Sequence, residues 1–169
     1  MIKIIDKRDE GAIIRYSYAW SELFNKVMQR TAAVANVMVT ADGADSFDVM
    51  SATADNTIEL QGYAEEAWRN VVSITRRYHY TAPCCCMHDE VKEYAIELAH
   101  PMNWDQTCAL PLDGSIDNYL VSAITRRWWL SRGHGDQVAV EAERIEAAEK
   151  EIRYSLNARE RYGRAARWI

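Results

Sequence analysis

Residues 113–131 read DGSIDNYLVSAITRRWWLS and decide the fold class that we predict for this chain. Apolar residues recur in this stretch at steps of three and four, which is the period of an amphipathic helix. They are Ile116, Tyr119, Leu120, Ala123, Ile124 and Trp128. Gly133-His134-Gly135 follows, and glycine readily adopts the left-handed conformation of a helix C-cap. We therefore predict a helix over 113–131.

Three further helices are predicted from the same period. The first covers residues 12–38, and the second begins near Asp55 or Asn56 and ends before Pro83, because the residue before a proline avoids the helical region. The last runs from Asp136 to about Arg161 on a narrow apolar stripe of residues seven apart, Val138, Ile145 and Ile152. Its other faces are charged, which indicates that one side packs and the rest contacts solvent.

Residues 90–99 show a different period, with apolar residues at the alternate positions Tyr94, Ile96 and Leu98. Alternation predicts a short strand, and its partner is either a neighbouring copy or residues 47–50. The predicted fold class is mainly α, with about four helices in a bundle-like arrangement. One short strand or hairpin lies between the second and third long helices.

Composition predicts one globular domain, because 169 residues with 49% hydrophobic and 27% charged residues can bury a full core. We divide the chain into a helical domain, residues 1–162, and a basic C-terminal tail, residues 163–169. The net charge of −5 excludes a chain-wide basic surface for nucleic acid or membrane. The longest apolar runs are too short to cross a bilayer, and no apolar signal segment follows the first residues. No membrane partner is expected, and the four cysteines are interpreted as thiols in a reducing compartment.

A cluster of cysteine and histidine residues raises the question of a metal site or a nucleophile. Cys84, Cys86 and His88 have the spacing of zinc ligands, but the consecutive thiols of residues 84–86 cannot all face one ion. An apolar loop with incidental cysteines is favoured over zinc, and no cofactor is predicted. A thiol nucleophile with His79, His88 or His100 as its base lacks the local signature of a cysteine hydrolase. We therefore predict that the protein is not an enzyme.

Charge is distributed asymmetrically near the C-terminus. Residues 141–151 are mostly acidic, whereas residues 153–169 contain five arginines and one glutamate. An arginine-rich tail with a tryptophan is suited to docking on a protein groove, which we favour over binding phosphate because the whole chain is acidic. The predicted interaction residues are Tyr94, Ile96, Leu98, Trp104, Trp129, Arg153, Arg159, Arg161, Arg164, Arg167 and Trp168.

The order of these parts carries a resemblance. Phe47-Asp48-Val49-Met50 leads through residues 53–56 into the helix over 57–78, and the strand over 94–98 runs into Pro101-Met102-Asn103-Trp104-Asp105. A helix containing residues 117–121 and Arg127-Trp128-Trp129 follows, and a long helix with Ala142, Ala148 and Ile152-Arg153 ends in the arginine-rich tail. Over residues 30–169 this arrangement resembles the head–tail connector (adaptor or head-completion) proteins of tailed phages.

The resemblance implies a non-catalytic virion subunit, made in the host bacterial cytoplasm and located in the neck of the particle. It implies a homo-oligomeric ring, commonly of twelve copies, between the portal and the tail. Its partners would be the portal protein and the tail or a second neck protein, with passive contact to DNA in the channel. Two alternatives remain open from the sequence. One is a tail-completion or terminator protein of the same neck, and the other is a small zinc-binding regulatory module that uses residues 84–88.

Overall fold

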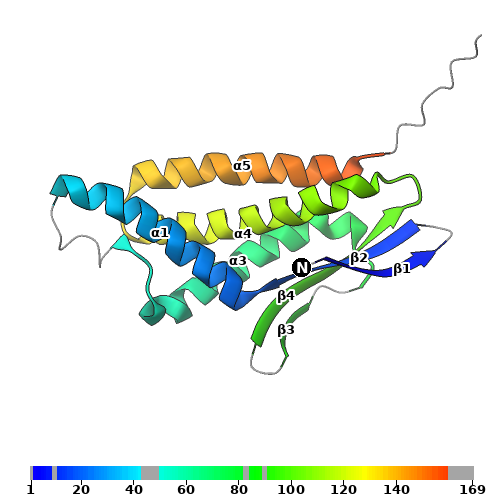
Figure 1. Cartoon of the computed structure of the whole chain (residues 1–169), viewed down its shortest axis with the longest axis horizontal. Coiled ribbons are helices and arrows are strands. Elements are labelled where there is room, and N and C mark those ends of the chain that lie inside the picture. The colour runs from blue at the N-terminus through cyan, green and yellow to red at the C-terminus, as the bar shows by residue number, and fades with distance from the viewer. Residues whose placement is uncertain (1, 9–10, 43–49, 82–83, 89–90, 160–169) are drawn as a thin grey trace, which may run out of the picture.

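The computed structural model describes residues 2–8, 11–42, 50–81, 84–88 and 91–159, which form an antiparallel sheet and four long helices (Figure 1). Short 3-10 turns at 54–56, 76–78 and 106–108 precede or follow the helices. In chain order the main elements are β1 (Ile2–Arg8), β2 (Gly11–Ala19), α1 (Trp20–Asp42), α3 (Thr57–Thr75), β3 (Cys84–His88), β4 (Val91–Pro101), α4 (Ala109–Ser131) and α5 (Gly135–Asn157).

The four strands are ordered β1-β2-β4-β3, and each neighbouring pair is antiparallel. The two central strands pair from Gly11 opposite Pro101 to Ala19 opposite Glu93. Side chains alternate between the faces of a strand, so Tyr16, Tyr18 and their cross-strand partners Ile96 and Tyr94 share one face. All four are buried beneath the helices. The sheet therefore contributes the aromatic side chains that form one side of the core.

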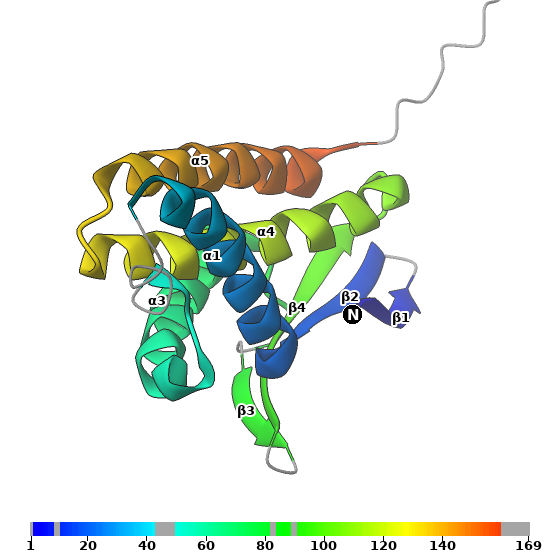
Figure 2. The ribbon, with the colours of Figure 1, turned by 60° about the vertical axis from the view of Figure 1, so that its left-hand side comes forward.

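The helices form two layers on one face of the sheet (Figures 1 and 2). α1, α3 and α4 pack against the strands, and α5 lies along the outer side of α4. Because α4 is enclosed by α5 on one side and by the sheet and α3 on the other, residues on nearly all of its faces are buried. Trp128 and Trp129 are consecutive, yet both are at most 1% exposed. α4 is thus the central helix of the core.

The predicted fold class is wrong, although the chain does contain four long helices. It places one short strand or hairpin between the second and third long helices, whereas the sheet begins at the N-terminus with β1 and β2, before any helix. The predicted helix over 12–38 includes residues 12–19 because Ile13, Tyr16 and Trp20 match the helical period. The same residues also alternate, with Ile14, Tyr16 and Tyr18 on one face. Pairing with β1 and β4 on both sides selects the strand.

The remaining differences concern the strand partner and the helix ends. The neighbours of β4 are β2 and β3, and residues 47–49 of the predicted partner lie outside the described residues. α4 begins at Ala109 and not at residue 113, because Pro111 lies in the first helical turn, where a missing N–H costs no hydrogen bond. α5 ends at Asn157, and residue 158 is extended. The boundary predicted between domain and tail at 162/163 lies outside the described residues.

Gly11 provides a sharp test of this sheet. Its φ is +139°, and a Cβ built there would lie 2.0 Å from the His100 carbonyl oxygen of β4. Gly11→Ala should lower the free energy of unfolding by at least about 2 kcal/mol, because it combines strained backbone with a backbone clash. Gly62→Ala is the matched control, since no atom lies within 4 Å of its Cβ position in α3. It should raise stability by about 0.5–1 kcal/mol through helix propensity. Equal effects in denaturant titrations would contradict the observed register.

Candidate functional site

Five of the predicted interaction residues lie in the core and offer no surface to a partner. Tyr94, Ile96, Leu98, Trp104 and Trp129 are each at most 1% exposed. The three β4 residues face the helices, and Trp129 is enclosed where α4 packs against its neighbours. The sequence pattern identified large apolar side chains correctly but assigned them to contacts between subunits. Their contacts are within the chain.

Trp104 lies in the turn after β4 and contacts the end of α5. Its indole Nε1 donates to the Ser155 carbonyl oxygen at 2.7 Å, and its backbone forms an isolated bridge with Arg159. The ring of His100 stacks on it, with 3.7 Å between centroids. Burial, and then the positive charge of Arg159, lower the pKa of His100 to about 4. The imidazole is therefore neutral at pH 7.

The predicted arginines are only partly within the described chain. Arg153 is exposed on α5 and pairs with Glu149 at 2.6 Å. Arg159 donates to the carbonyl oxygens of Leu156 and Ala158 at 3.3 and 3.0 Å. Arg161, Arg164, Arg167 and Trp168 lie outside the described residues. The structure thus describes the point from which the basic tail departs and not the tail itself.

The metal candidates occupy alternate positions of the edge strand β3. Cys84, Cys86 and His88 pair with Ala95, Glu93 and Val91 of β4, and their side chains lie outside what the structure describes. Among the described residues, no group of three or more His, Cys, Asp or Glu side chains is arranged to hold a metal ion. Cys108 is a half-buried free thiol. Its pKa is raised by burial and then by the nearby carboxylates of Asp105 and Glu151.

An open groove of about 860 Å³ lies between α1, α4 and α5. Small and apolar side chains from all three helices line it, among them Ala33, Val34, Val121, Ala147 and Ala148. Charged side chains complete the lining, namely Lys26, Arg30, Asp117, Arg144 and Glu151. A groove with this lining is chemically compatible with an amphipathic segment, because the small residues permit close approach and the polar and charged residues offer hydrogen-bonding groups.

The charges beside this groove hold its walls in place. Glu141 of α5 is 2% exposed and accepts from Arg30 of α1 at 3.2 Å and from Arg144 at 2.7 Å. Arg30 also donates to the Ser122 hydroxyl of α4 at 2.8 Å. Lys26 pairs with Asp117 at 2.7 Å, so each of the three cations lining the groove already has an acidic partner. The groove is therefore not a preformed anion site.

Sequence reasoning missed Arg30, Ser122 and Glu141, although one signal was present. Glu141 falls on the apolar stripe of α5, three residues after Val138 and four before Ile145. A carboxylate on a buried stripe needs a buried cationic or hydrogen-bonding partner. The partner itself could not be inferred, because Arg30 is 111 residues away in the chain.

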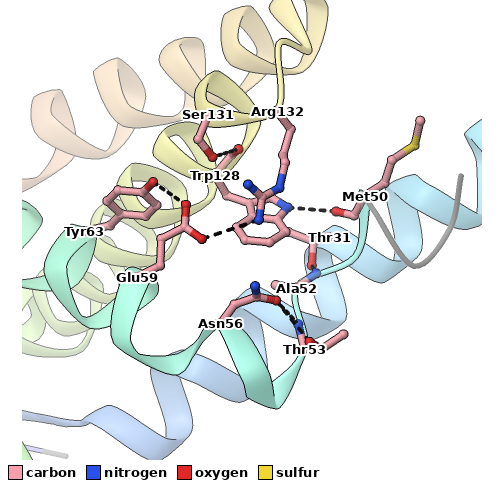
Figure 3. A network of polar contacts seen from close by, with 10 residues as sticks. All are labelled: Thr31, Met50, Ala52, Thr53, Asn56, Glu59, Tyr63, Trp128, Ser131 and Arg132. Atoms are coloured by element: carbon pink, nitrogen blue, oxygen red, sulfur yellow. Dashed lines mark hydrogen bonds and ion pairs between the residues drawn. The ribbon is translucent and has the colours of Figure 1, made fainter.

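A second polar network joins Met50 and the start of α3 to the C-terminal end of α4 (Figure 3). Trp128 Nε1 donates to the Met50 carbonyl oxygen at 2.8 Å, and the guanidinium of Arg132 lies 4.1 Å from the centroid of a Trp128 ring. Arg132 pairs with Glu59 at 3.4 Å, and Glu59 accepts from the Tyr63 hydroxyl at 2.7 Å. These contacts join the C-terminal end of α4 to Met50 and to α3.

Exposed apolar side chains gather at both ends of α4. The N-terminal apolar group comprises Met102, Leu110 and Tyr154, which are 66–76% exposed. The C-terminal apolar group comprises Ile58, Leu130 and Val140. Leu110 and Leu130 are twenty residues apart, which places the two groups about 30 Å apart along the helix. They form two different surfaces on opposite ends of one rigid element.

Comparison of the chain with protein families, with curated proteins and with solved structures returns no match. Among the described helices, none combines the length and apolar character needed to span a bilayer. The function is therefore proposed from the residues and their geometry.

The buried carboxylate of Glu141 provides a stability test. Glu141→Gln leaves two guanidinium groups facing a neutral amide, so the free energy of unfolding should fall by about 2–3 kcal/mol. Glu146→Gln removes an exposed pair with Lys150 on the same helix and should leave stability unchanged. Urea titration of both variants measures the contrast. Equal losses would show that the ion pairs of Glu141 with Arg30 and Arg144 contribute no more to stability than an exposed ion pair does.

His100 predicts a specific pH dependence. Its pKa is about 4 in the folded chain and about 6.5 when unfolded, so between these values the unfolded state binds more protons. Its contribution to stability is present above pH 6.5 and declines as the pH falls to 4, by about 3 kcal/mol in total. Denaturant titrations at pH 7, 6, 5 and 4 measure this slope. His100→Phe, which keeps a ring beside Trp104, should flatten it. An unchanged slope in the variant would contradict the assignment.

Proposed function

We propose that this protein is a non-catalytic structural subunit that joins other subunits, in the role of a head–tail connector of a tailed phage. The observation that carries the proposal is the pair of apolar groups at opposite ends of α4. Two different surfaces that contact each other in neighbouring copies give a head-to-tail arrangement, and such contacts close into a ring when the rotation between copies permits. The proposed assembly is a homo-oligomeric ring.

The rigidity of α4 supports this role. A ring subunit must keep its two contact surfaces at a fixed separation, because a small change of angle in each copy accumulates around the ring. α4 is packed along its length by α5, and its C-terminal end is held by Met50, Glu59 and Arg132. The turn that precedes its N-terminal end is joined to α5 through the hydrogen bond from Trp104 to Ser155. Both apolar groups therefore lie on well-supported backbone.

The wider role rests on the resemblance of residues 30–169 to connector proteins. On that basis the ring contains about twelve copies and lies in the virion neck, with the portal on one side and the tail or a second neck protein on the other. The net charge of −5 suits passive contact with DNA in the channel, because an acidic subunit neutralises few phosphates. The Arg-rich C-terminal segment is assigned to protein contacts.

Light scattering of the purified chain, combined with electron microscopy, tests the proposal. The wild-type chain should form a closed ring. Leu110→Asp or Leu130→Asp should each prevent ring closure, and an equimolar mixture of the two should form a heterodimer, because each variant retains one intact contact surface. Ser73→Asp, on an exposed position of α3, is the control and should form the ring.

Two results would contradict the proposal. A wild-type chain that stays monomeric at every accessible concentration would remove ring formation. Normal rings from both Leu110→Asp and Leu130→Asp would show that the ends of α4 are not the contact surfaces.

A further inference from the structure

We propose that the groove between α1, α4 and α5 binds residues 160–169 of a neighbouring copy, so that each subunit extends a C-terminal arm into the next. This inference rests on the proposed function and names the segment and the surface that strengthen assembly. Two independent features point to it. One is the lining of the groove, and the other is the residue pattern of the segment.

The segment 160–169 reads ERYGRAARWI. Four of its five apolar residues, Tyr162, Ala165, Ala166 and Ile169, fall at i, i+3, i+4 and i+7, which is the spacing by which an amphipathic helix enters a groove, and Trp168 lies outside this row. Its arginines fall at 161, 164 and 167, a separate row with a three-residue period. The small side chains of the groove, Ala33, Ala147 and Ala148, allow such a segment to approach closely.

The net charge of the segment is opposite in sign to that of α5. α5, which forms one wall of the groove, contains six acidic residues and three basic ones. The segment 160–169 contains three arginines and one glutamate. Of the two carboxylates that line the groove, Asp117 is already paired with Lys26, so Glu151 is the one with which an arginine of a bound segment can pair. The cations of the groove are already paired with acids of the same chain, which leaves less repulsion toward an incoming basic segment.

The length of the segment favours binding to a neighbouring copy over binding within the same chain. The contacts of Trp104 with Ser155 and Arg159 hold residues 155–159 beside the turn after β4. Helical residues 162–169 folded back along α5 would extend about 12 Å, and so return only to about the level of Glu151. The α5 residues lining the groove run from Arg144 to Glu151. The segment of the same chain would therefore cover only one end of the groove.

The position of the segment also agrees with the proposed ring. α5 ends beside the N-terminal apolar group, where Tyr154 belongs to that group. In a head-to-tail ring this group meets the C-terminal apolar group of the next copy, which includes Val140 of its α5. From Val140 the groove begins only four residues further on, at Arg144. Residues 160 and 161 span about 7 Å when extended, which matches the rise of about 6 Å over those four helical residues, so residues 162–169 remain to lie in the groove as a helix.

Complementary variants of the full chain test the arm. The double substitution Ala33→Trp/Ala147→Trp fills the groove but keeps the segment, and deletion of residues 160–169 keeps the groove but removes the segment. The deletion leaves every described residue in place. Sedimentation velocity should show that either change weakens self-association at least about tenfold. An equimolar mixture should recover association, because one partner supplies a groove and the other a segment. Ser73→Trp should associate as the wild type does.

The outcomes separate this inference from the proposed function. Rings that form normally with a filled groove or without residues 160–169 would overturn the arm and leave the connector role intact. A wild-type chain that never self-associates would overturn both. Hydrogen exchange distinguishes the two modes of binding. If deletion speeds exchange of the backbone amides along the groove by the same factor at every protein concentration, the segment binds within its own chain, and binding to a neighbouring copy is contradicted. Folding of each variant is checked by its denaturation midpoint.

Discussion

The burial of α4 on opposite sides is the constraint on which the rest of the structure depends. A helix that is apolar on one side needs a single partner, but α4 has side chains to bury on opposite sides, with Leu120, Trp128 and Trp129 all nearly inaccessible. The sheet with α1 and α3 covers one side of α4, and α5 covers the other. Without α5, a long apolar surface of α4 would contact water. Without α1, α3 and α4, the tyrosines of β2 and β4 would lose their cover as well.

This arrangement explains which parts of the fold the sequence could predict. The approximate positions of the helices follow from local periodicity, since Leu60, Trp68 and Val71 of α3 or Ile145 and Ile152 of α5 repeat at the spacing of a buried stripe. The N-terminal hairpin does not follow from it. Ile13, Tyr16 and Trp20 satisfy a helical period while Ile14, Tyr16 and Tyr18 satisfy a strand period. Pairing with β4, about eighty residues away in the chain, determines that these residues form a strand.

The candidate surfaces were harder to predict for the same reason. The large apolar residues Trp104 and Trp129 resemble contact residues in the sequence, because tryptophan is frequent in interfaces, but both are needed inside. The exposed residues Leu110 and Leu130 carry a weaker signal, since each lies out of phase with the buried stripe of Ile116, Leu120 and Ile124. Without knowing that α4 is enclosed, no residue on it could be assigned to the surface. Burial on both sides removes most of the large apolar side chains of the helix from solvent and leaves Leu110 and Leu130 exposed near its ends.

The groove shows how charge and packing combine at such a surface. Glu141 lies on the buried stripe of α5 and pairs with Arg30 of α1, so an ion pair joins the two helices that form walls of the groove. An apolar residue at 141 would pack against α4 but could not fix α1 in place. The ion pair therefore specifies the separation of the walls more than it adds to stability, since the desolvation of a buried carboxylate offsets much of its attraction to arginine. The proposed C-terminal arm suits such a groove, because Ala165 and Ala166 at the centre of its apolar row have small side chains.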